Sequence, residues 1–80
     1  MWCVYLLRCG DGTLYAGMTN DLDKRLMAHR AGKGARYTRG RGPLKLVYSE
    51  PVADRSAALK REHALKQLPR REKLRLRSRR

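Results

Sequence analysis

Two short apolar runs at the start of the chain predict a β-hairpin. Residues 2–9 are apolar and rich in β-forming side chains, and residues 13–18 have a similar composition. Between them, Gly10-Asp11-Gly12 supplies the positive φ angles that a tight turn requires.

The length of this turn decides where two tyrosines lie. A two-residue turn would place Tyr5 and Tyr15 on opposite faces of the ribbon, because side chains alternate with a period of two. A three-residue loop, residues 10–12, pairs Tyr15 with Leu7 and puts both tyrosines on one face. We expect the three-residue loop.

After the hairpin, the pattern changes to helical spacing. Asn20 and Asp21 offer an N-cap for a helix that runs to about Arg30 and stops at Gly32. Residues 31–43 are dominated by glycine and basic side chains, and we expect no regular element there.

The second half of the chain predicts one strand and two helices. The strand covers residues 44–49, a helix covers about 54–68 until Pro69 breaks it, and a short basic helix and tail follow from about residue 69. The order ββαβαα predicts an α+β fold with a three-stranded, mainly antiparallel sheet flanked by helices. Eighty residues allow a single domain, 1–80.

The charge of the chain points to a polyanionic partner. Twenty Lys and Arg residues against seven Asp and Glu residues give a formal net charge of +13. Such a field favours nucleic acid, because phosphate neutralisation releases counterions. An acidic lipid surface, or solubility alone, is the alternative explanation.

Cysteine usage and hydropathy indicate a cytoplasmic protein without a membrane partner. Cys3 and Cys9 lie on one expected strand, too far apart for a disulfide, and predict reduced thiols. No basic leader precedes the first strand, and no apolar stretch approaches the roughly 18 residues needed to span a bilayer.

The first expected helix carries polar groups on its apolar face. Leu22, Arg25, Leu26 and His29 fall within one arc at 100° per residue. Either Arg25 and His29 have a function there, or both lie at the helix edge and extend to solvent.

The second expected helix poses a similar question at Glu62. This carboxylate falls within a broad apolar arc, beside Leu65. It is either paired with Lys66 at i+4, anchored to an arginine, or directed into a cleft. The arc consists of Ala57, Ala58, Leu59, Ala64, Leu65 and Leu68.

Tyrosines add further candidates. Tyr5 and Tyr15 are ordinary strand residues, for which packing is the simplest explanation. Tyr37 lies in the loop rich in glycine and arginine, where an aromatic ring suits base stacking.

Together these features resemble the GIY-YIG nuclease family over about residues 2–68. The two half-motifs appear as Cys3-Val4-Tyr5 and Tyr15-Ala16-Gly17, with Cys3 in place of the opening glycine. The matching downstream residues are Arg25, His29, Glu62 and a glycine-rich loop from Gly32 to Gly40. The chain looks most like short, stand-alone bacterial members, which are similar to the nuclease domain of the eukaryotic subunit that resolves branched DNA.

The resemblance implies a metal-dependent endonuclease acting on DNA, with branched, nicked and single-stranded DNA as candidate substrates. Glu62 would hold one Mg²⁺ or Mn²⁺, and Arg25 would contact the scissile phosphate. Tyr5, Tyr15 or His29 would be the general base, and the sequence leaves that choice open.

The resemblance also implies partners. Backbone phosphates are expected to bind Lys33, Arg36, Arg39, Arg41, Lys66 and the basic tail, and Tyr37 is expected to contact the substrate or help complete the site. A protein partner would direct targeting, and we expect a bacterial protein associated with the nucleoid when bound. A binding module with the same fold but weak catalysis, or an RNA-associated accessory protein, is the alternative.

Overall fold

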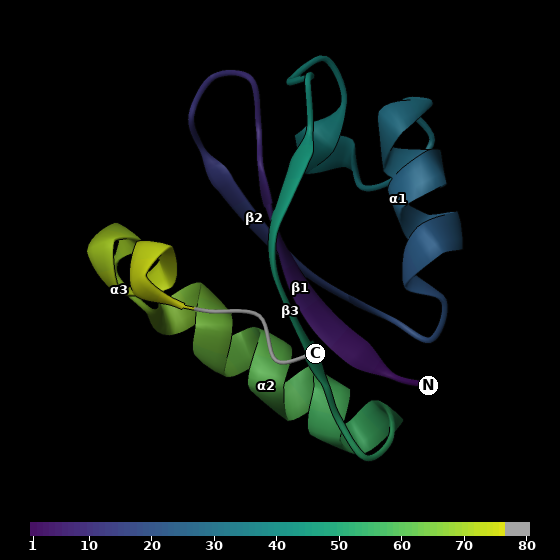
Figure 1. Ribbon diagram of the computed structural model, residues 1–80, viewed down its shortest axis with the longest axis vertical. Helices are drawn as coiled ribbons and strands as arrows, with labels where there is room; N and C mark the ends of the chain where they lie inside the picture. The colour runs from purple at the N-terminus through teal and green to yellow at the C-terminus, as the bar shows by residue number, and fades with distance from the viewer. Residues whose placement is uncertain (77–80) are drawn as a thin grey trace.

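The computed structural model describes residues 1–76 and has the predicted element order ββαβαα (Figure 1). The elements are β1 (Cys3–Arg8), β2 (Leu14–Thr19), α1 (Leu22–Arg30), β3 (Lys45–Pro51), α2 (Arg55–Gln67) and α3 (Arg70–Arg75). A short 3₁₀ turn, η1 (Arg36–Thr38), lies between α1 and β3. The predicted α+β class is confirmed. The expected tail beyond residue 76 lies outside the described residues.

The three strands form one antiparallel sheet with β1 in the centre, in the order β2-β1-β3. Tyr5 pairs with Gly17, and Leu7 pairs with Tyr15. The hairpin therefore has the predicted three-residue loop, and Tyr5 and Tyr15 share one face of the sheet. Within that loop Gly12 adopts a φ of 86°, which explains the need for glycine there.

The two faces of the sheet carry different helices. Val4 and Leu6 of β1 pack with Ala58 and Leu65 of α2. The alternate residues of β1 contribute to a second cluster that includes Leu26 of α1. Figure 1 shows the sheet with α1 and α2 on different sides. Period-two alternation along β1 thus separates the molecule into an α1 face and an α2 face.

Local capping explains where the helices begin and end. The side chain of Asp21 accepts a hydrogen bond from Lys24 N at 3.1 Å at the start of α1. After α1, Gly32 adopts a φ of 77°, as expected for a residue that ends a helix. Asp54 caps α2 by accepting from Ala57 N at 2.8 Å.

Two expectations about packing were wrong. Residues 31–43 do contain a regular element, η1, because the Thr38 hydroxyl bonds back to the Ala35 carbonyl and tightens the chain into a turn. The apolar arc of α2 is also narrower than expected: Leu59 is 45% exposed and Ala64 is exposed. A helix lying on a three-stranded sheet buries only the stripe that faces the sheet.

The cysteines are free thiols, as expected, where the structure describes them. Cys3 and Cys9 are both free, with Cys9 buried and Cys3 half-buried. Among the helices of residues 1–76, none has the length and apolar character needed to cross a membrane.

Candidate functional site

A hydrogen-bonded chain of three side chains occupies the α1 face of the sheet. The hydroxyl of Tyr5 lies 2.8 Å from Nε2 of His29, and Nδ1 of His29 lies 2.9 Å from Oγ1 of Thr38. All three residues are buried. The chain joins β1, α1 and η1, which are far apart in the sequence.

Arg25 lies beside this chain and is half-buried. Burial raises the pKa of Tyr5 to about 12, an effect that hydrogen bonding with Arg25 and its positive charge oppose. Burial also lowers the pKa of His29, and the charge of Arg25 adds to that decrease. Both Tyr5 and His29 are therefore neutral at pH 7.

The suggestion that both polar groups of α1 extend to solvent is wrong for His29, which is 2% exposed. The histidine remains in the interior because both ring nitrogens have partners there. Arg25 is half-buried, so only part of its side chain reaches solvent.

Aromatic rings extend the site from the interior to the surface. Tyr15 lies with its ring centroid 5.5 Å from that of His29, in an edge-on arrangement. Tyr37 stacks on Tyr15 at 5.7 Å, and the guanidinium of Arg41 lies 4.4 Å from the ring centroid of Tyr37. The Tyr37 ring thus has two partners within the molecule, yet it remains 42% exposed.

Two glycines allow the buried rings to lie where they do. A Cβ at Gly17 would overlap the phenol of Tyr5, and a Cβ at Gly34 would overlap the imidazole of His29. Gly17 belongs to the second half-motif, which explains in physical terms why glycine stands there. Sequence reasoning missed the roles of Gly34 and Thr38, because nothing in the loop composition indicates which residues are buried.

Glu62 lies apart from these residues. It is carried by α2, which covers the other face of the sheet, and its carboxylate forms an ion pair with Lys66 at 3.5 Å. The i,i+4 pair considered from the sequence is therefore present. The structure brings together Tyr5, Tyr15, Arg25 and His29, and leaves Glu62 on the α2 face.

A metal centre built from several protein ligands is absent from residues 1–76, which contain no group of three His, Cys, Asp or Glu side chains placed to hold an ion. Glu62 nevertheless fits a site with one protein ligand. Mg²⁺ commonly binds through one or two carboxylates and completes its shell with water and substrate phosphates. The side chain is 20% exposed, and its partner Lys66 is half exposed, so an ion can compete for the carboxylate.

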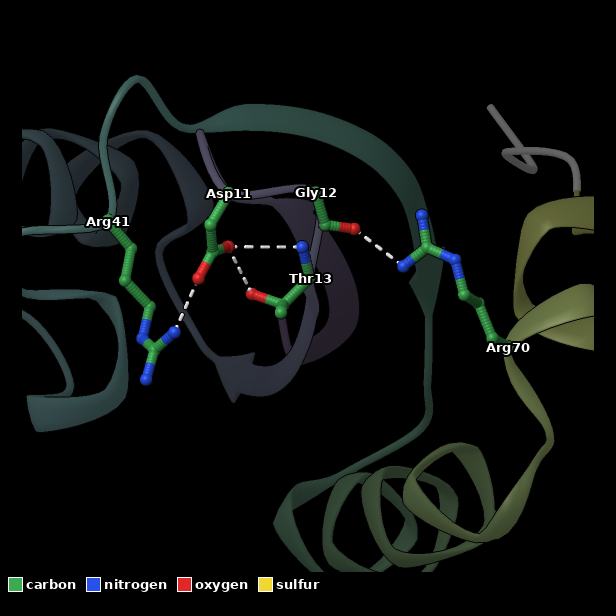
Figure 2. Close-up of polar contacts among 5 residues, drawn as sticks. All are labelled: Asp11, Gly12, Thr13, Arg41 and Arg70. Atoms are coloured by element: carbon green, nitrogen blue, oxygen red, sulfur yellow. Dashed lines mark hydrogen bonds and ion pairs between the residues drawn. The ribbon is translucent and has the colours of Figure 1, made fainter.

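The expected phosphate-binding residues divide between two regions. Lys33, Arg36 and Arg39 are exposed on the loop that borders the aromatic rings, whereas Lys66 lies on α2. Arg41 is already engaged at the hairpin tip, where it bonds Asp11 (Figure 2). Its backbone carbonyl also accepts the N–H of Gly10.

Figure 2 also shows how α3 is fastened to the same hairpin. Arg70 donates to the carbonyl of Gly12, while Asp11 accepts from the backbone and hydroxyl of Thr13. The hairpin tip therefore holds both the loop before β3 and the start of α3.

Two pockets border the site. One, of about 290 Å³, is lined by His29, Arg30 and Thr38 together with Leu44 and the glycines of the loop. The other, of about 270 Å³, is lined by Thr19, Lys24 and Arg25 among others, at the start of α1. Arg25 thus lines a pocket and also lies near Tyr5.

Several known proteins are similar to this chain. It is 53% identical over 73 residues to the UPF0213 protein OB0043 of Oceanobacillus iheyensis, covering 91% of this chain and 85% of that protein. It is 51% identical over 75 residues to the UPF0213 protein YhbQ of Escherichia coli, covering 94% and 75%.

Solved structures show the same similarity. The solution NMR structure of the UPF0213 protein BH0048 of Bacillus halodurans is 46% identical, with a TM-score of 0.56, covering 91% of this chain and 79% of that one. The solution NMR structure of the protein EF2693 of E. faecalis is 39% identical, with a TM-score of 0.61, covering 90% and 77%.

The family model described as the GIY-YIG catalytic domain matches residues 1–75. This match includes the hairpin with both tyrosines, the helix with Arg25 and His29, and the helix with Glu62. The chain therefore belongs to the GIY-YIG family, a nuclease superfamily, and its relatives are short stand-alone members of it.

Proposed function

We propose that this protein is a divalent-metal-dependent endonuclease that hydrolyses phosphodiester bonds of DNA. The observation that carries the proposal is the 2.8 Å contact between the Tyr5 hydroxyl and Nε2 of His29, beside the half-buried Arg25. A phenol bonded to a neutral imidazole is a route for removing a proton from water, and a guanidinium beside it suits a phosphate.

The pKa directions decide how the proton would move. With a pKa near 12, the Tyr5 phenol does not ionise alone at neutral pH. It can, however, accept a proton from water while it gives its own proton to His29. In that step one O–H bond of water breaks, the attacking oxygen bonds to phosphorus as the bond from phosphorus to the 3′ oxygen breaks, and His29 becomes an imidazolium. The departing 3′ oxygen takes a proton from solvent.

Access to the phenol depends on Arg25. Tyr5 is fully buried, and Arg25, which influences the Tyr5 phenol, also lines the pocket at the start of α1. When a phosphate enters that pocket, the guanidinium turns toward a non-bridging oxygen and uncovers the phenol. Arg25 then stabilises the negative charge that develops on the phosphate.

Glu62 would hold the metal ion. Because α2 covers the other face of the sheet, the DNA backbone would have to pass around the sheet edge for this ion to reach the phosphate that Arg25 contacts. There Mg²⁺ or Mn²⁺ would supply positive charge for the phosphate and the leaving 3′ oxygen. The ion pair with Lys66 would open as the ion binds.

DNA is the proposed substrate because of the net charge of +13 and the exposed Lys33, Arg36 and Arg39 beside the aromatic rings. These contacts reach phosphates and carry no base sequence. Selection of branched, nicked or single-stranded sites would then come from shape or from a protein partner.

A nucleic-acid-binding module without catalysis is the second candidate. The Glu62–Lys66 ion pair and the complete burial of Tyr5 favour it, because an active nuclease needs both groups accessible. The two functions differ in whether the phosphodiester bond is broken.

Cleavage of labelled single-stranded, duplex and branched DNA, with Mg²⁺ or Mn²⁺, tests the proposal. We expect metal-dependent cutting that disappears in Glu62→Gln, while DNA binding and the melting temperature stay near wild type. Glu72→Gln is the matched control, since Glu72 is a half-buried carboxylate on α3. Salt-sensitive binding without cutting by the wild-type protein would contradict the nuclease and favour the binding module.

A further inference from the structure

Thr38 is an unexpected member of the site. It lies at the end of η1 in a loop rich in glycine, yet it is only 2% exposed. Its Oγ1 is 2.9 Å from Nδ1 of His29 and 2.9 Å from the carbonyl oxygen of Ala35. A surface loop therefore buries a hydroxyl against the imidazole that contacts Tyr5.

The hydrogen atoms of this chain can be assigned one by one. The Thr38 hydroxyl has a single hydrogen and donates it to the carbonyl of Ala35. Toward His29 it can then only accept, so the proton of the neutral imidazole lies on Nδ1. Nε2 is left without a proton and accepts the hydroxyl hydrogen of Tyr5.

The opposite end of the chain supports the same assignment. Burial raises the pKa of the Tyr5 phenol, and the charge of nearby Arg25 opposes that rise. A guanidinium can only donate, so it can meet the phenol oxygen only as an acceptor. The hydrogen of that phenol is then directed to His29. The donors at one end and the acceptors at the other are consistent with one direction only: Tyr5 to His29, His29 to Thr38, Thr38 to Ala35.

We infer that Thr38 is a positioning residue that holds the proton of His29 on Nδ1, so that Nε2 faces Tyr5 as a proton acceptor. The inference rests on the proposed function for its catalytic meaning, but the position of the proton can be measured independently. Thr38 acts through His29 and touches no reacting atom.

The chemistry of a hydroxyl suits this task. A carboxylate at the same place would also hold the proton on Nδ1, but its charge would favour the imidazolium before any proton is transferred. Thr38 orients the ring without adding charge. Among the described residues, titratable and charged groups near His29 include Tyr5 from β1, Tyr15 from β2 and Arg25 on its own helix, and Arg30 lines the same pocket.

The same hydrogen bonds also orient His29 in its protonated, imidazolium form. When Nε2 takes the phenol proton, Nδ1 keeps its hydrogen and its bond to Thr38. No side chain has to turn, so the ring is already oriented for both states of the reaction.

Nitrogen-15 NMR of the histidine side chains tests the inference without DNA or metal. In the wild-type protein at pH 7.5 or above, about one unit over the ordinary histidine pKa, we expect His29 to show a protonated Nδ1 and an unprotonated Nε2. Exposed His63 provides an internal reference in the same spectrum. A wild-type spectrum with the proton on Nε2 would overturn the inference.

Variants of Thr38 sharpen the test. Thr38→Val keeps the branched shape and removes the acceptor, and we expect His29 to shift toward the Nε2–H form. Thr38→Ser keeps the hydroxyl and should retain the wild-type pattern. Thr13→Val is the matched control, because the Thr13 hydroxyl bonds Asp11 at the hairpin tip. An unchanged His29 spectrum in Thr38→Val would contradict the inference.

Cleavage kinetics add a second readout. We expect kcat of Thr38→Val to fall by at least about tenfold, within the roughly 10²–10⁴-fold that a general base contributes, with little change in KM and with recovery in Thr38→Ser. Equal losses in the valine and serine variants, at unchanged melting temperature, would overturn the positioning role. If Thr38→Val does not fold, the wild-type and serine spectra still decide the proton position. An inactive wild-type protein would remove the nuclease but leave the NMR result standing.

Discussion

The two faces of β1 differ in what they contribute to the molecule. On the α2 face, Val4 and Leu6 are fully buried against aliphatic side chains of the helix. On the α1 face, Tyr5 is equally buried, but it lies in a hydrogen-bonded chain with His29 and Thr38. Neighbouring residues on one strand thus take part in apolar packing on one side and in a buried polar network on the other.

The difference teaches how so short a chain can hold a buried polar site. Among residues 1–76, buried side-chain nitrogen and oxygen atoms all have hydrogen-bond partners. The α1 face therefore avoids the cost of unpaired buried groups, about 1–3 kcal/mol each. The α2 face supplies the apolar burial that a small domain needs in order to fold.

The largest expected effect is on the α2 face. Leu65→Ala removes a fully buried side chain packed against Val4 and Leu6. We expect a loss of about 2–5 kcal/mol in the free energy of unfolding. Leu59→Ala, at a position 45% exposed on the same helix, should stay within about 0.5 kcal/mol of wild type. Urea denaturation measures the free energy of unfolding of both variants. Similar losses in the two variants would contradict the claim that buried packing on the α2 face stabilises the fold.

An intermediate effect is expected where the two strands of the hairpin meet on the α1 face. Gly17→Ala places a methyl group against the phenol of Tyr5 and displaces the ring from His29. We expect a loss of about 1–3 kcal/mol in stability and a larger loss of cleavage activity. Gly42→Ala, where a Cβ meets no heavy atom within 4 Å, is the control. Full activity in Gly17→Ala would show that the Tyr5 ring position does not matter.

The smallest expected effect is the pH dependence of stability that His29 confers. Burial lowers the folded-state pKa of His29 below its ordinary value of 6.5, so the unfolded chain binds the proton more readily. The contribution of His29 is therefore fully present above about pH 6.5 and is lost as pH falls toward the folded-state pKa. The slope cannot exceed about 1.4 kcal/mol per pH unit for one group.

Thermal melts between pH 5 and pH 8 measure this slope. His29→Gln should flatten it, whereas His63→Gln, at an exposed position on α2, should retain it. Equal slopes in wild type and His29→Gln would assign the pH dependence to other groups.

Much of the fold follows from the sequence because its signals are local. The turn of residues 10–12 fixed the register that places Tyr5 and Tyr15 on one face, and Asp21 and Gly32 marked the ends of α1. Each of these signals depends on a few neighbouring residues. The structure confirms all of them.

The site was only partly predictable because its remaining contacts are long-range. Helical spacing placed His29 toward the sheet, but no local pattern indicates that Thr38 would reach its ring. Likewise Tyr37 was expected to stack on bases, and its partners in the structure are Tyr15 and Arg41. Such contacts depend on how a glycine-rich loop folds over a helix.

The position of β1 at the centre of the sheet also shapes how the chain folds. On one edge Tyr5 pairs with nearby Gly17, but on the other edge it pairs with distant Ser49. The hairpin can close quickly, whereas the pairing with β3 must wait for a long loop to close. Until then, one edge of β1 presents unpaired backbone groups to other chains. Misassembly during folding should therefore begin at the edge that β3 later covers.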